Sequence, residues 1–123
     1  MEQKKILIVE DDPTLRETLK EFMIKEDFQV FAAADGEEGV ISAKTENPDL
    51  ILLDIILPKK NGYEVIKELR ADEVTKRTPI VLLTNLGSLS DIEKALSLGA
   101  TTYLVKNDYK LKEITDKIRE LLN

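Results

Sequence analysis

The chain has 123 residues and a formal net charge of −6, and it contains no cysteine and no histidine. This length suits one domain with a buried core, which we predict to span residues 1–123. The missing side chains exclude disulfides, thiolate or imidazole metal ligands, and a histidine nucleophile or base. The negative charge argues against nucleic acid or an anionic membrane as a direct partner. Because no apolar run approaches the roughly 20 residues that span a bilayer, we expect a soluble, cytoplasmic protein.

Three uninterrupted apolar runs predict strands that are buried on both faces, as in the middle of a parallel sheet. These runs span residues 6–9, 50–53 and 80–83. A more polar run at residues 28–33 predicts a strand nearer an edge of the sheet. Residues 101–105 predict a short fifth strand.

Apolar residues at helical spacing follow each of these strands and predict five helices. The first helix is expected to start after Asp12 as its N-cap, with Pro13 in its first turn. Ser90 or Asp91 is a candidate cap for the fourth helix, and Gly99 is expected to close it. The remaining helices are expected after residue 35, after residue 62 and over residues 111–122.

Strands that alternate with helices indicate a parallel sheet with helices on both faces and right-handed crossovers. The predicted fold class is therefore α/β, a doubly wound five-stranded sheet with flavodoxin-like (βα)5 topology. Among the doubly wound orders, 2-1-3-4-5 uses five strands and places strands one and three side by side at the switch point, where such sheets bind ligands. The ligand crevice is then expected between Glu10-Asp11 and Asp54.

Side chains that can carry chemistry stand at four of the predicted strand ends. Glu10 and Asp11 follow the first strand, and Asp54 follows the third. Thr84 ends the fourth strand, and Lys106 follows the fifth. Three converging carboxylates would repel one another and raise one another's pKa. A hard divalent cation such as Mg²⁺ removes that repulsion, because it favours carboxylate, carbonyl, water and phosphate oxygens.

Phosphoryl transfer to an aspartate requires a carboxylate nucleophile, a metal, a fixed cation and a hydroxyl donor. In that chemistry Asp54 would attack in line, while Lys106 and the metal would neutralise the transferred group. Each residue alone also has a plainer explanation. The acidic run 10–12 could complement the dipole of the next helix, Thr84 could simply end its strand, and Lys106 could be a surface lysine. Their joint placement on successive strand ends is what favours a site.

The sequence resembles the receiver domains of two-component response regulators over essentially its whole length. The residues that carry the resemblance are the run 6–13, Asp54 with Pro58 and Gly62, Thr84 after its apolar strand, Gly99-Ala100, and Lys106 after Tyr103. The resemblance implies that Asp54 is the phosphoacceptor. It also implies that Asp11 and Asp54 bind Mg²⁺ directly together with the backbone carbonyl of Ile56, and that Glu10 acts through a metal-bound water.

The same resemblance implies a switch that links the site to a distant surface. Thr84 would close on the phosphoryl group, and Lys106 would pair with it. Tyr103 corresponds to the aromatic side chain that swings inward as Thr84 moves, and this motion would reshape the surface of the fourth helix, the fifth strand and the fifth helix.

One position departs from the family pattern. Most members have proline after the lysine, joined to it by a cis bond, whereas this chain has Asn107. A cis bond before a residue other than proline costs about 3–4 kcal/mol. We therefore predict either a trans peptide with a shifted loop or a strained cis peptide after Lys106.

The partners expected by resemblance follow from the missing histidine. A phosphohistidine donor must come from a separate histidine kinase or histidine phosphotransfer protein. An output domain or effector protein would respond to phosphorylation, and a phosphorylation-dependent homodimer is a further partner that we consider. The domain would catalyse only its own phosphorylation and dephosphorylation, so we do not expect an enzyme acting on other substrates.

Three other functions fit the same topology less well. An FMN site would need phosphate-binding Ser, Thr and Gly groups where the chain has the acidic run 10–12. A phosphatase of the haloacid dehalogenase type needs a second acid two residues after its nucleophile, and that position is Ile56. A phosphorylation-independent interaction module with the receiver fold is the alternative that remains open, and the substitution at Asn107 is what keeps it open.

Overall fold

The computed structural model describes residues 3–84, 89–106 and 110–122. All strand pairs in it are parallel, and the five-stranded sheet has the order β2-β1-β3-β4-β5. The elements in chain order are β1 (Lys5–Val9), α1 (Pro13–Lys25), β2 (Gln29–Ala33), α2 (Gly36–Glu46), β3 (Leu50–Leu53), α3 (Gly62–Ala71), β4 (Ile80–Thr84), α4 (Leu89–Leu98), β5 (Thr102–Val105) and α5 (Leu111–Leu122). The predicted fold class and strand order are confirmed.

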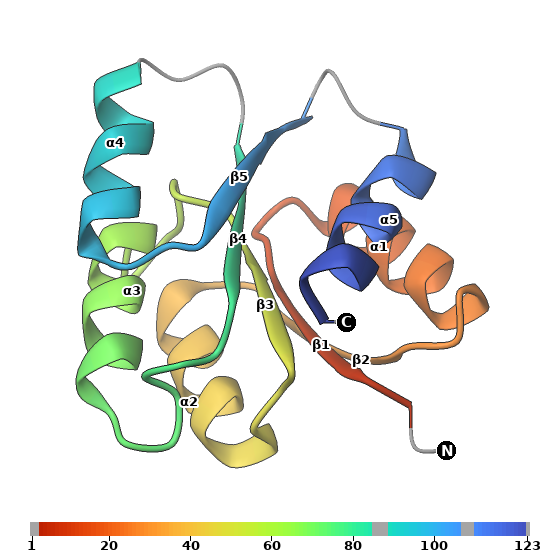
Figure 1. The fold of residues 1–123 in the computed structure, drawn as a ribbon, viewed down its shortest axis with the longest axis horizontal. Helices are drawn as coiled ribbons and strands as arrows, with labels where there is room; N and C mark the ends of the chain where they lie inside the picture. The colour runs from red at the N-terminus through yellow and green to blue at the C-terminus, as the bar shows by residue number, and fades with distance from the viewer. Residues whose placement is uncertain (1–2, 85–88, 107–109, 123) are drawn as a thin grey trace.

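Helices cover both faces of this sheet. Figure 1 shows α2, α3 and α4 on one side, with α1 and α5 on the other. The three central strands, β1, β3 and β4, are the ones that the uninterrupted apolar runs predicted, and all residues of β3 and β4 are buried. The more polar β2 lies at an edge, where its outer side needs no partner strand.

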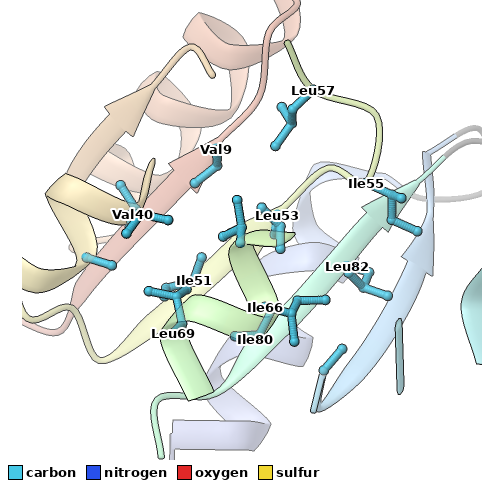
Figure 2. Packing of buried hydrophobic residues seen from close by; sticks show 14 of the residues in the cluster. Val9, Val40, Ile51, Leu53, Ile55, Leu57, Ile66, Leu69, Ile80 and Leu82 are labelled. Atoms are coloured by element: carbon cyan, nitrogen blue, oxygen red, sulfur yellow. The ribbon is translucent and has the colours of Figure 1, made fainter. Parts of the chain in front are cut away.

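Alternate residues of the central strands supply two separate cores. One core joins Leu7, Val9, Ile51, Leu53, Ile80 and Leu82 to α2, α3 and α4. Figure 2 shows this packing, with Val40 of α2 and Ile66 and Leu69 of α3 against the strand residues. The other core joins Ile6, Ile8, Leu50, Leu52, Val81 and Leu83 to α1 and α5. Burial on both faces explains why these strands lack the polar alternation of a half-exposed sheet.

The start of α1 and the end of α4 follow the predicted signals. The Asp12 side chain caps α1, and Pro13 lies in its first turn. Gly99 closes α4 with a φ of +123°, a backbone conformation that favours glycine. The predicted cap of α4 is wrong, because the helix begins at Leu89 and so contains both Ser90 and Asp91 in its first turn. No helix among the described residues is long and apolar enough to cross a membrane.

Candidate functional site

The register of the parallel strands gathers the predicted site residues at one edge of the sheet. Val9 pairs with Leu53, so Glu10 and Asp54 follow at adjacent strand ends. The backbone N–H of Asp54 still donates to the Val9 carbonyl at 3.0 Å, which continues the ladder to the phosphoacceptor candidate. Thr84 pairs with Val105, and Lys106 is the next residue. The carboxyl ends of β1, β3, β4 and β5 therefore converge as expected.

These residues line one cavity of about 270 Å³. Its lining residues are Glu10, Asp11, Asp12, Asp54, Ile56, Thr84 and Lys106. All the residues predicted from the strand ends thus belong to the same cavity. Tyr103 does not line it, because its side chain is on the surface with 38% of its area exposed.

Lys106 bridges two carboxylates in this cavity. Its Nζ donates to Asp54 Oδ2 at 2.9 Å and lies 2.7 Å from Glu10 Oε1. Its side chain is 14% exposed, compared with 2% for Glu10 and 9% for Asp54. Because little water screens these charges, the contacts count for more than ion pairs on an open surface.

Burial and charge act in opposite directions on these groups. Burial raises the pKa of Glu10, and the neighbouring Asp54 charge adds to this effect, although Lys106 and the Asp12 N–H partly oppose it. Burial alone would lower the pKa of Lys106, but its contacts with Glu10 and Asp54 outweigh burial and raise that pKa above 10.5. Lys106 therefore remains a cation at neutral pH, and Glu10 binds a proton more readily than a free glutamate.

Local backbone contacts hold Asp54 and the loop that follows it. Asp54 Oδ1 accepts from the backbone N–H of Ile56 at 3.3 Å, which orients the carboxylate. Farther along, the Gly62 N–H donates to the Ile55 carbonyl at 2.7 Å. A Cβ atom at Gly62 would lie only 2.6 Å from Ile55 Cα, so this close approach requires glycine.

Three carboxylates in the cavity fit a divalent cation. One oxygen from each of Glu10, Asp11 and Asp54 can be chosen so that the three lie within 4.8 Å of one another. Glu10 Oε1 is also enclosed, and its contact among the described residues is the ion pair with Lys106 at 2.7 Å. Oxygen donors in this number are those that Mg²⁺ prefers.

Several contacts around the site were not predicted from the sequence. The direct pairing of Glu10 with Lys106 was not predicted, and neither were the contacts of Arg16 and Gly36 with the loops of the site. No sequence signal reports such contacts, because each joins residues from different elements. The predicted alternatives for the Lys106–Asn107 peptide fall outside the described residues.

Comparisons with known proteins agree with this geometry. Residues 6–119 match the family described as "Response regulator receiver domain". The chain is 44% identical over 119 residues to the transcriptional regulatory protein CiaR of Streptococcus pneumoniae, a match that covers 96% of this chain and 51% of CiaR. It is 40% identical over 120 residues to the probable transcriptional regulator ycf27 of Cyanophora paradoxa, covering 98% of this chain and 48% of the relative. The chain thus spans about half the length of the curated relatives that it matches.

A solved structure extends the comparison to the metal. The receiver domain of the sensor histidine kinase PA1611 from Pseudomonas aeruginosa is described with a magnesium ion coordinated in its active-site cleft. It superimposes with a TM-score of 0.89 at 32% identity, covering 98% of each chain. With the family match and these relatives together, the chain belongs to the response regulator receiver domains of two-component signal transduction.

Proposed function

We propose that Asp54 accepts a phosphoryl group from a phosphohistidine donor in a Mg²⁺-dependent reaction. The observation that carries this proposal is the position of Asp54, with its carboxylate against the Lys106 ammonium at 2.9 Å in a cavity that three further acids line. A nucleophilic carboxylate beside a fixed cation is the arrangement that phosphoryl transfer to aspartate needs.

The transfer forms one bond and breaks one. An oxygen of the Asp54 carboxylate attacks phosphorus in line, the bond from phosphorus to the donor imidazole nitrogen breaks, and the imidazole keeps that electron pair. Lys106 holds its positive charge beside the developing charge on the phosphoryl oxygens. Asp11, Asp54 and the Ile56 carbonyl would hold Mg²⁺, with Glu10 acting through a water. The bound cation would supply the remaining charge neutralisation.

We also propose that the acyl phosphate favours a second arrangement of the surface formed by α4, β5 and α5. Thr84 is 7% exposed and lines the same cavity as Asp54, which supports a role for its hydroxyl in bonding the phosphoryl oxygens. Tyr103 lies on the neighbouring strand and is 38% exposed, so an inward rotation would bury more of it. Phosphorylation shifts the equilibrium because the oxygens bond better to the closed arrangement.

The proposed partners are a separate phosphodonor and an output. The chain contains no histidine, so the donor is a histidine kinase or a histidine phosphotransfer protein. The curated relatives are transcriptional regulators about twice as long as this chain, which suggests an output domain or effector. A phosphorylation-dependent homodimer, a cytoplasmic location, and a lack of direct contact with nucleic acid or membrane complete the proposal. The domain would act on itself alone rather than as an enzyme.

The experiment is incubation with acetyl phosphate and Mg²⁺, followed by measurement of the intact mass. We expect one phosphoryl adduct on the native chain, and none on Asp54→Ala or after addition of a chelator. If the folded protein gains no adduct while a known receiver is labelled alongside it, the phosphorylation-independent interaction module becomes the better account.

A further inference from the structure

Arg16 of α1 reaches back to the loop that carries two of the site carboxylates. Its Nη1 donates to the Glu10 carbonyl at 2.9 Å and to the Asp11 carbonyl at 3.3 Å. The backbone N–H of Arg16 also donates to the Asp12 carbonyl at 2.9 Å, as the first turn of α1 requires. One side chain thus ties the start of the helix to the end of β1.

These two carbonyls have a particular relation to Asp11. The Glu10 carbonyl belongs to the peptide unit before the Asp11 Cα, and the Asp11 carbonyl belongs to the unit after it. A donor that holds both peptide units restrains the two backbone dihedrals of Asp11, and the backbone on either side sets the direction of its Cα–Cβ bond. Arg16 therefore holds the backbone from which the Asp11 carboxylate extends.

Asp11 needs such support more than the other acids do. Glu10 is buried and held by Lys106 and by the Asp12 N–H at 3.1 Å, and Asp54 is held by Lys106 and by the Ile56 N–H. Asp11 is exposed, yet its carboxylate belongs to the three-acid cluster. Positioning of this group must come largely from the backbone on either side of it.

We propose that Arg16 is a positioning residue for the divalent cation, acting through the backbone of Asp11. This inference rests on the proposed function, in which Asp11 is a direct metal ligand. An alternative effect of Arg16 has the opposite sign, because a guanidinium beside the loop of the acidic cluster also repels an incoming cation. Positioning predicts that loss of Arg16 weakens metal binding, whereas charge repulsion alone predicts that the same loss strengthens it.

The test is direct titration with Mn²⁺, with free metal followed by electron paramagnetic resonance. We expect Arg16→Met to raise the Kd about tenfold, as losses of outer-shell support commonly do. Arg16→Lys keeps the charge, but its ammonium is one bond shorter and does not hold both carbonyls, so it is also expected to raise the Kd. Lys25→Met removes one positive charge from the far end of α1 and is expected to leave the Kd unchanged.

A second readout separates positioning from general damage. Circular dichroism first establishes that each variant is folded. If Arg16→Met does not fold, the metal titration is done with Arg16→Lys instead. With acetyl phosphate, we expect the Arg16 variants to need more Mg²⁺ for half-maximal labelling but to approach the native rate at saturating metal. Such a split is not expected if a variant only lowers stability.

The outcomes distinguish this inference from the proposed function. If Arg16→Met binds Mn²⁺ as tightly as the native chain or more tightly, the positioning role is overturned while the phosphoacceptor proposal stands. An Arg16→Lys variant with native affinity would also overturn it, because the lysine ammonium does not hold both carbonyls. If the native chain binds no Mn²⁺ and gains no phosphoryl group, the proposed function fails first, and this inference fails with it.

Discussion

Lys106 Nζ and Asp54 Oδ2 lie 2.9 Å apart, and the same ammonium contacts Glu10 at 2.7 Å. One cation therefore balances two buried carboxylates. Lys106→Met leaves both without that charge, so we expect a loss of about 2 kcal/mol in the free energy of unfolding of the metal-free protein. Urea denaturation in the presence of a chelator measures this loss.

Mg²⁺ should stabilise Lys106→Met more than the native chain, because the metal then balances carboxylates that no longer have a lysine. Lys67→Met provides the control, since it removes an exposed lysine of α3 and should change stability by less than about 0.5 kcal/mol. An equal effect of Mg²⁺ on the native and Lys106→Met proteins would contradict the idea that lysine and metal serve the same two acids.

Glu10 gives a pH dependence whose sign follows from its pKa. Burial raises the pKa of the folded Glu10 above 4.5, so the folded chain holds this proton more tightly than the unfolded chain does. The contribution of Glu10 to stability therefore falls as the pH rises from 4.5 through the higher folded pKa. Glu10→Gln removes this penalty and should be more stable than the native chain at neutral pH without metal.

The difference in the free energy of unfolding between Glu10→Gln and the native protein should disappear as the pH falls below 4.5. There the native Glu10 is protonated in both the folded and the unfolded chain. Urea denaturation at the two pH extremes, with chelator present, compares them. A Glu10→Gln protein that is less stable at neutral pH would mean that the pairing with Lys106 outweighs burial. Added Mg²⁺ should stabilise the native chain more than Glu10→Gln, because the native chain keeps all three acids.

The fold was predictable because its signals are local. Apolar runs such as 50–53 are explained by burial on both faces, and the alternation of strands and helices restricts the topology. The convergence of Asp54, Thr84 and Lys106 follows from the same step, since parallel strands end at a common edge.

Contacts that depend on packing between elements were not predictable in this way. The approach of Lys106 to Glu10 depends on where β5 ends relative to β1, and no spacing in the chain encodes that distance. The contact of Arg16 with two carbonyls requires the turn into α1 to be in place first. The start of α4 at Leu89 also differs from the expected caps, because polar residues within a first turn resemble caps in sequence.

Gly36 joins α2 to the loop that follows Asp54. A Cβ atom at this position would lie 1.7 Å from the Lys60 carbonyl oxygen, and a backbone atom cannot give way as a side chain can. Gly36→Ala should therefore lower the free energy of unfolding by about 1–3 kcal/mol. It should also weaken Mn²⁺ binding, because the displaced loop carries Ile56.

Gly39→Ala is the matched control in the same helix. Its Cβ would meet two methyl groups of Val9 at 2.9 and 3.0 Å, and the gain in helix propensity of about 1 kcal/mol offsets part of that crowding. We expect Gly39→Ala to lose less free energy of unfolding than Gly36→Ala in urea denaturation. It should also leave the Kd for Mn²⁺ unchanged. If Gly36→Ala were the milder substitution, the packing of α2 would not position the loop.

Thr84 tests the proposed link between the site and the distant surface. Beryllofluoride with Mg²⁺ mimics a phosphoryl group on Asp54, and in the native chain it should shift the nuclear magnetic resonance signals of Tyr103. Thr84→Ala lacks the hydroxyl that we propose to bond the added group, so the Tyr103 shift should be largely lost even when the mimic binds. Thr84→Ser keeps the hydroxyl and should retain most of the shift. A full Tyr103 response in Thr84→Ala would mean that the signal reaches β5 without this hydroxyl, and the coupling would then have to run through Lys106, which already contacts Asp54 and follows Val105 directly.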